Sequence, residues 1–399
     1  MKRVGLVFAV LLVLSGLVAA LNWRFFERYI SFLRLGGDAL TVPVDWYEPL
    51  ATLDTGEVGT LPRALRPTIP VNALEQASDY AREQGSLALL VARLGRIEYE
   101  EYWDGFTEDD WFNPQSMSKT VLGMAVGIAV GEGHLKVSDP IGQYVTEWAD
   151  DPRGAITIEN LLQMSGGLEQ ISRDYRPVPW SRGVWQHFGS DFDSHALDLD
   201  LVDSPGTRFD YNNNESQLLG LALERATGLK YPDFLSLRLW QPLGLGPAAM
   251  YLDRPRGRVM KSCCILSRPV DWLALGQLML NNGSWRGRQL IPAEWVKAMT
   301  TPAATHEGYG YQVWLGDGSL WHIGNHPGPE VYTWWGSEPY AEEGVYAFLG
   351  YGYQNVWVVP SLDLVILRAA REWPPNAWDV SRIPNLLIRA LRNPEGFNQ

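Results

Sequence analysis

Ser116 and Lys119 are three residues apart at the start of a long apolar stretch, a spacing that can support acyl transfer. Residues 116–131 are mostly apolar and end at a Gly-Glu-Gly sequence, which predicts a buried helix. Both side chains then lie on one helical face. Burial lowers the proton affinity of a lysine, so Lys119 could accept the proton of Ser116 Oγ. The helix N-terminus would favour the resulting oxyanion. A capping serine with an exposed lysine is the alternative interpretation.

A second polar group, Tyr211-Asn212-Asn213, follows a Pro-Gly turn and precedes a predicted helix. Tyr211 could relay protons between Ser116, Lys119 and a leaving group, and Asn213 could donate its amide to a substrate carbonyl. An Asn-rich turn that caps the helix is the alternative. The similar Tyr353-Gln354-Asn355 enters a predicted strand, and we interpret it as structural.

A third group, Gly350-Tyr351-Gly352, lies between two strand-like segments. Glycines at a strand edge let a substrate approach the backbone, where a main-chain N–H could complete an oxyanion hole. A glycine-rich turn without a catalytic role is the alternative.

The elements that must position these groups follow from hydrophobic periodicity and turn residues. The sequence predicts helices at 71–84, 116–131, 157–164, 215–227, 270–281, 293–299 and 380–392, and strands at 87–94, 97–103, 345–349, 356–359 and 364–368. Strands thus lie near both ends of the chain, with a helical middle. We expect one antiparallel sheet covered by the terminal helices, with the helical block inserted alongside.

The composition excludes several other classes of protein. The net charge is -13, from 33 Lys and Arg against 46 Asp and Glu, without a basic run, so we do not expect nucleic-acid binding. The six histidines lack other ligand residues at suitable spacing, and we predict no metal site and no cofactor. Cys263 and Cys264 are adjacent, and we interpret them as two buried thiols in preference to a bridge.

The amino-terminal sequence predicts that the protein is exported. Lys2 and Arg3 are basic, and residues 4–21 form an apolar run that just reaches the length needed to span a bilayer. We favour an uncleaved anchor over a signal peptide, with the body on the periplasmic side of the inner membrane, or periplasmic or secreted if cleaved. Residues 22–72 comprise an amphipathic stretch suited to an interface and a linker. We expect residues 40–399 to retain catalysis.

Together these motifs resemble the serine β-lactamase and penicillin-recognising superfamily, particularly its class C-like esterases and 6-aminohexanoate-dimer hydrolases. The likeness covers roughly residues 85–370 and includes segments 116–119, 161–168, 205–213, 308–311 and 350–360. It implies an α+β fold, with a helix-flanked antiparallel sheet and an inserted all-helical domain. The hydrolase domain would span 73–395, with the helical subdomain at about 115–300. By this resemblance Ser116 is the acylated nucleophile, Lys119 its base and Tyr211 the second acid/base.

The third motif departs from the family pattern. Gly350-Tyr351-Gly352 stands where β-lactamases and carboxypeptidases have Lys or His, then Thr or Ser, then Gly, so a cationic anchor for a substrate carboxylate is missing. Residues 322–328 are a second, inferior placement of this motif. By spacing, Tyr175 could correspond to a substrate-contacting tyrosine of the aminohexanoate-type enzymes, but we favour its interpretation as a solvent-exposed loop residue.

We therefore expect a serine hydrolase that acts on a small ester or amide through an acyl-enzyme. β-Lactamase or DD-peptidase activity is the first alternative. The second is a non-catalytic, membrane-anchored scaffold of the same fold.

Overall fold

The computed structural model describes residues 13, 16–20, 22–59, 61–171, 181–316 and 336–397. Most of the predicted signal or anchor segment, residues 1–21, lies outside these ranges, so its role stays a prediction. In the part of the chain that is described, no helix combines the length and the apolar character needed to cross a bilayer.

The main sheet joins strands from the two ends of the chain. Its order is β3-β2-β11-β10-β9-β8, and all neighbouring pairs are antiparallel. The strands are β2 (Ser86–Arg93), β3 (Arg96–Tyr102), β8 (Trp314–Leu315), β9 (Tyr346–Gly350), β10 (Gln354–Val359) and β11 (Leu364–Ala370). The β2–β3 hairpin turns at Leu94 and Gly95, which both have positive φ. The predicted terminal sheet is therefore confirmed.

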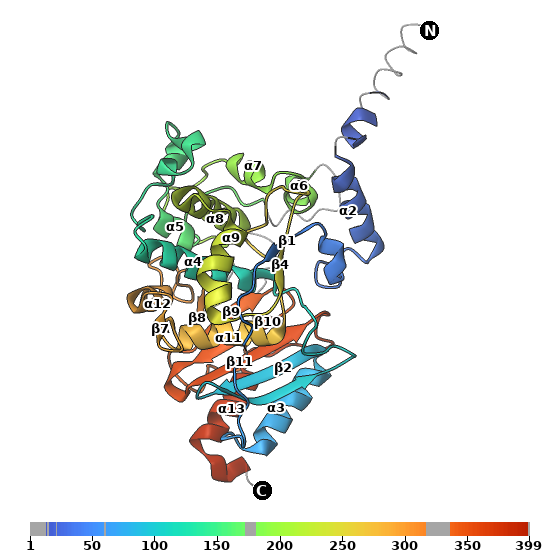
Figure 1. The fold of residues 1–399 in the computed structure, drawn as a ribbon, viewed down its shortest axis with the longest axis vertical. Coiled ribbons are helices and arrows are strands. Elements are labelled where there is room, and N and C mark those ends of the chain that lie inside the picture. The colour runs from blue at the N-terminus through green and yellow to red at the C-terminus, as the bar shows by residue number, and fades with distance from the viewer. Residues whose placement is uncertain are drawn as a thin grey trace.

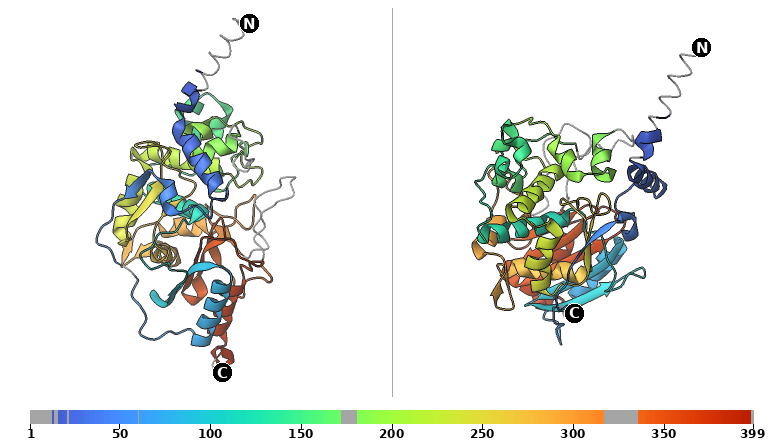
Figure 2. Two further views of the ribbon diagram at one scale, coloured as in Figure 1. Left: turned by 90° about the vertical axis from the view of Figure 1, so that its right-hand side faces the viewer. Right: turned by 45° about the horizontal axis from the view of Figure 1, so that its top comes forward.

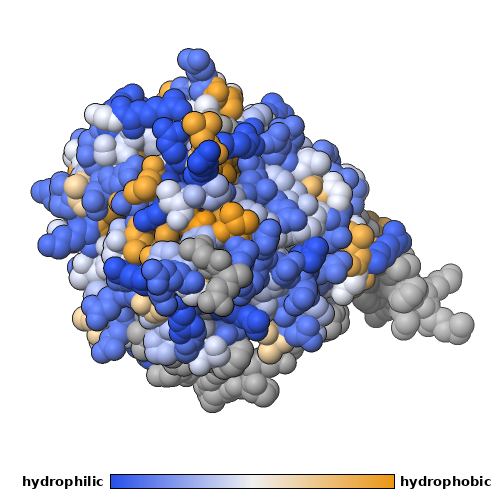
Figure 3. Space-filling view, turned by 90° about the horizontal axis from the view of Figure 1, so that it is seen from below, coloured by the Kyte–Doolittle hydropathy of each residue, from blue (hydrophilic) through white to orange (hydrophobic). Residues whose placement is uncertain are grey.

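Helices cover both faces of this sheet (Figure 1). On one face lie α3 (Val71–Glu83) and α13 (Arg382–Arg392), which contact each other; on the other lies α11 (Pro269–Leu280). Alternate strand residues face opposite layers, so Val356 and Val358 pack in the cluster containing α11, and Trp357 and Val359 pack with α3 and α13. The side of the molecule shown in Figure 3 is mostly hydrophilic with scattered apolar patches.

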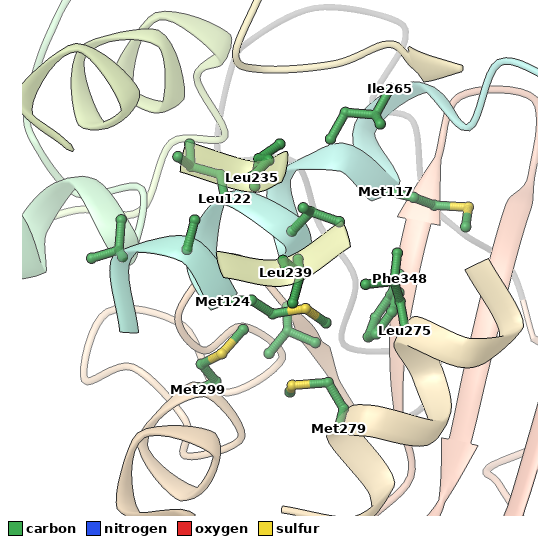
Figure 4. Close-up of a cluster of buried hydrophobic side chains, with 14 of the residues drawn as sticks. Met117, Leu122, Met124, Leu235, Leu239, Ile265, Leu275, Met279, Met299 and Phe348 are labelled. Atoms are coloured by element: carbon green, nitrogen blue, oxygen red, sulfur yellow. The ribbon is translucent and has the colours of Figure 1, made fainter. Parts of the chain in front are cut away.

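The inserted region is mainly helical and lies above the sheet in Figure 1. Its helices are α4 (Ser118–Gly131), α5 (Ile158–Leu162), α6 (Arg182–Phe188), α7 (Phe192–Leu197), α8 (Asn213–Thr227), α9 (Tyr231–Leu235), α10 (Gln241–Leu243) and α12 (Ala293–Met299). Nearly every side chain of α4 is buried, as its composition predicts. Figure 4 shows Met117, Leu122 and Met124 packed among side chains from neighbouring helices and from β9.

Short strands that the sequence did not predict also lie in this region. They are β4 (Ala248–Tyr251), β5 (Ile265–Leu266), β6 (Ser284–Trp285) and β7 (Arg288–Gln289). Strand β1 (Leu50–Leu53) pairs with β4, which in turn pairs with β5. The predicted linker thus contributes a strand to a second, three-stranded sheet among the described residues.

The amphipathic stretch of the amino-terminal segment forms α2 (Trp23–Arg34), which packs against α6 (Figure 2). The Phe25 ring stacks on Trp185 with 3.8 Å between centroids. Buried Arg28 donates hydrogen bonds to the Leu252 and Asp253 carbonyl oxygens. The aromatic and basic residues of one helical face therefore contact the protein body, although the sequence had suggested a membrane interface.

Candidate active site

Ser116 lies in a tight turn immediately before α4. Gln115, the preceding residue, has φ +54°, and its backbone N–H donates to Asn113 Oδ1 at 2.9 Å. The 3₁₀ turn Gln115–Met117 leads directly into the helix. This geometry places the Ser116 hydroxyl at the helix N-terminus, where backbone N–H groups and the helix dipole favour negative charge.

Lys119 Nζ is held by three oxygen atoms. It lies 2.9 Å from Ser116 Oγ, 2.7 Å from Asn213 Oδ1 and 2.7 Å from the Ser262 carbonyl oxygen. The side chain is 1% exposed. Burial penalises the charged form and lowers the pKa of Lys119 from its ordinary 10.5 to about 7. The amine is therefore substantially neutral at neutral pH.

Tyr211, in the turn before α8, and Asn213, the first residue of α8, reach the same point. The Tyr211 ring centroid is 5.0 Å from Lys119 Nζ, within the range of a cation–π contact. Asn212 caps α8 through its side chain, which accepts from the Asn214 N–H. Because Asn213 Oδ1 accepts from Lys119, the side-chain amide nitrogen of Asn213 is the group left to donate to a substrate.

The turn Tyr351-Gly352-Tyr353 joins β9 to β10 beside Ser116. A Cβ at Gly350 would lie 2.1 Å from the Pro114 carbonyl oxygen, so glycine is required for this approach. Gly352 has φ +74°, and a Cβ there would meet Leu40 at 2.4 Å. Buried Arg368 on β11 donates to the Gly352 and Tyr353 carbonyl oxygens and thereby holds the turn.

These groups line a single cavity of about 530 Å³. The predicted residues Ser116, Tyr211, Asn213 and Gly350–Gly352 all border it, and Lys119 contacts Ser116 at its wall. Tyr175 and residues 322–328 lie outside the described residues, so their predicted roles stay predictions. Tyr353 also borders the cavity, but Gln354 and Asn355 belong to buried β10.

Sequence reasoning missed the wall formed by the amino-terminal segment. Tyr29, Phe32 and Leu33 of α2 border the cavity, as do Val42 and Trp46. The aromatic, amphipathic pattern was the available signal, but it does not reveal what the helix packs against. A fragment of residues 40–399 would lack α2 and with it part of the cavity wall, so its expected catalysis stays a prediction.

The interpretation of Cys263 and Cys264 as two buried thiols is wrong. Cys263 and Cys264 form a disulfide in the structure, and both border the cavity. Cys264 has φ +72°, and its N–H donates to the Gln115 carbonyl oxygen. The pair follows Ser262, whose carbonyl oxygen holds Lys119, so this loop contacts both Lys119 and the residue that precedes Ser116.

Comparison with known proteins gives a consistent result. The model of the family described as Beta-lactamase matches residues 71–390. A 6-aminohexanoate-dimer hydrolase from Paenarthrobacter ureafaciens is 27% identical over 72% of this chain and 72% of its own. Esterase EstB from Burkholderia gladioli is 29% identical over 43% and 48%. A solved Bacillus anthracis structure, assigned as a 6-aminohexanoate-dimer hydrolase, has a TM-score of 0.72 at 18% identity and covers 90% of this chain and 94% of its own.

Proposed function

Because this chain belongs to the beta-lactamase family of serine hydrolases and their relatives, we propose that it hydrolyses an ester or amide through an acyl-enzyme on Ser116. The relatives that support a hydrolase include both an amide-cleaving enzyme, the 6-aminohexanoate-dimer hydrolase, and an esterase. The proposed reaction uses Ser116 as nucleophile, Lys119 as its base and Tyr211 as the second acid/base. These three residues lie together at the cavity.

The environment of Lys119 is the observation that carries this proposal. A neutral amine has two N–H groups and one lone pair. Asn213 Oδ1 and the Ser262 carbonyl oxygen accept the two N–H groups, at 2.7 Å each. The lone pair is then directed at the Ser116 hydroxyl, 2.9 Å away, and the pKa of about 7 leaves the amine able to accept its proton.

The reaction proceeds in two steps. Ser116 Oγ attacks the substrate carbonyl carbon as its proton passes to Lys119 Nζ, and the Tyr211 ring stabilises the new ammonium charge. The N–H groups of Ser116 and of the turn at Tyr351 stabilise the oxyanion. The proton then passes through Tyr211 to the leaving group, whose bond to the carbonyl carbon breaks. Water, activated by the same groups, hydrolyses the acyl-enzyme and regenerates Ser116.

The alternatives receive less support. β-Lactams and peptidoglycan peptides present a carboxylate, and Gly350-Tyr351-Gly352 offers it no cationic side chain. A non-catalytic scaffold does not need a buried lysine, which costs stability unless it serves a purpose. The intact arrangement of Ser116 and Lys119 therefore favours an enzyme.

The test compares the full chain with Ser116→Ala on p-nitrophenyl acetate. We expect p-nitrophenol release and a transient acetyl adduct in intact-mass spectra of the parent, and neither in the variant. Ser361→Ala is the matched control, because Ser361 is exposed and does not border the cavity. Equal turnover by the parent and Ser116→Ala would refute the proposal.

We also propose, from the basic and apolar character of residues 1–21, that the chain is exported and stays anchored at the periplasmic face of the membrane. A disulfide at Cys263–Cys264 is compatible with an oxidising compartment. Fusion of residues 1–40 to a reporter that is active only after export tests this proposal, and a reporter that stays inactive would refute it.

A further inference from the structure

The cavity beside Ser116 has a neutral lining. None of its described lining residues is Asp, Glu, Lys or Arg. Burial lowers the pKa of His187, the one imidazole among them, and favours its uncharged form. A charged substrate group placed here would lose its hydration without gaining an ionic partner among these residues. The volume of about 530 Å³ is typical of sites for small molecules.

Aromatic and aliphatic side chains from distant segments form much of the lining. Phe32 and Leu33 come from α2, Val42 and Trp46 from the segment that follows it, and Phe188 from the end of α6. Phe32, Trp46 and Phe188 contact one another, with ring centroids 5.0 to 6.2 Å apart. These contacts make one continuous apolar wall.

Hydrogen bonds connect this wall to the nucleophile turn, residues 113–117, which carries Ser116. Gln115 Nε2 donates to the Ala39 carbonyl oxygen at 3.1 Å, and Asn113 Nδ2 donates to Tyr47 Oη at 2.7 Å. Leu40 packs over Gly352 in the turn after β9. The amino-terminal segment is thus part of the site, and the position of Ser116 depends on the contacts of this segment.

The disulfide keeps the lining neutral at another point. Cys263 and Cys264 border the cavity as a bonded pair, so neither sulfur can form a thiolate. Cys263 Sγ lies 3.2 Å from Met260 Sδ, and Met260 also borders the cavity. Three sulfur atoms therefore add a polarisable, apolar surface to the wall.

We infer that the acyl portion of the substrate is an uncharged, medium- or long-chain apolar group that occupies this cavity. The inference rests on the proposed acylation of Ser116. The acyl group stays in the site through both steps, bonded to Ser116 from the first until water releases it in the second, whereas the leaving group departs after the first step. The acyl group therefore gains most from a fixed apolar wall. Each methylene that it buries strengthens binding about fourfold.

The experiment uses the full chain and three p-nitrophenyl esters. Octanoate and acetate differ in chain length, and octanoate and the suberate half-ester differ mainly in a terminal carboxylate. We expect kcat/KM for octanoate to exceed the values for acetate and for the half-ester by about tenfold or more.

Two variants on α2 test the wall itself. Leu33→Asp introduces a charge at a residue that borders the cavity, and Ile30→Asp introduces the same charge at a residue that does not. Leu33 and Ile30 are matched in exposure, at 45% and 44%. We expect Leu33→Asp to lower the octanoate-to-acetate ratio about fivefold or more, and Ile30→Asp to leave it unchanged.

The outcomes separate this inference from the proposed function. Ser116-dependent cleavage without preference for octanoate, equal cleavage of the half-ester, or equal ratios in the two variants would overturn the inference and leave the hydrolase assignment standing. Cleavage that persists in Ser116→Ala would instead overturn the proposed function, and the inference with it.

Discussion

Replacing Lys119 by methionine should change how the stability of the protein depends on pH. The lysine is buried, and its pKa is about 7 in the folded chain against an ordinary 10.5. Between pH 7 and pH 10.5 Lys119 is mostly neutral in the folded chain and mostly charged in the unfolded chain, so unfolding takes up a proton. The free energy of unfolding therefore rises with pH in this window, and this increase is lost as the pH falls through 7. Methionine has a similar length and carries no titratable group.

The magnitude follows from the proton uptake. Each pH unit within this window contributes about 1.4 kcal/mol, and from pH 6 to pH 9 the folded Lys119 loses most of its proton. The parent should therefore gain roughly 2 to 3 kcal/mol more than Lys119→Met over this interval. The lost hydrogen bonds to Asn213 and Ser262 shift the stability of the variant, but by nearly the same amount at both pH values.

Urea unfolding of both proteins at pH 6 and pH 9 measures this difference directly. Other titrating groups, such as buried Glu215, are present in both proteins, and their contributions cancel in the comparison. Lys119→Met should also lose hydrolysis, since it lacks the base. Parallel pH dependences of unfolding would show that Lys119 keeps an ordinary pKa in the folded state, and the reasoning about a neutral base would fail.

Two further predictions concern the turn after β9 and the cysteine pair. Gly350→Ala should lower kcat/KM for p-nitrophenyl acetate on the order of 100-fold, because its Cβ would lie 2.1 Å from the Pro114 carbonyl oxygen and displace the nucleophile turn. Gly336→Ala, whose nearest contacts would be at 3.5 Å, should retain activity, and equal rates in the two variants would contradict the explanation. Iodoacetamide should add no mass to the unfolded, unreduced chain and two labels after reduction, because Cys263 and Cys264 are paired; labelling before reduction would show free thiols.

Local pattern was enough to predict most of the fold. The strand-like segments near residues 345–368 and the apolar stretch after Ser116 form the predicted elements, since periodicity and turn residues act over a few positions. The spacing of Ser116 and Lys119 placed both on one face of a helix for the same reason. Tyr211 and Gly350 were found through motif order along the chain.

The remaining features of the site depend on contacts between residues far apart in the sequence. The Ser262 carbonyl oxygen holds Lys119 across 143 positions, and the Ala39 carbonyl oxygen accepts from Gln115 across 76. The sequence by itself determined the long helices α3, α4, α8, α11 and α13, the terminal sheet and the predicted catalytic pair, because local interactions encode them. Only the tertiary structure decided which surface α2 covers and what lines the cavity, because packing alone brings those segments together.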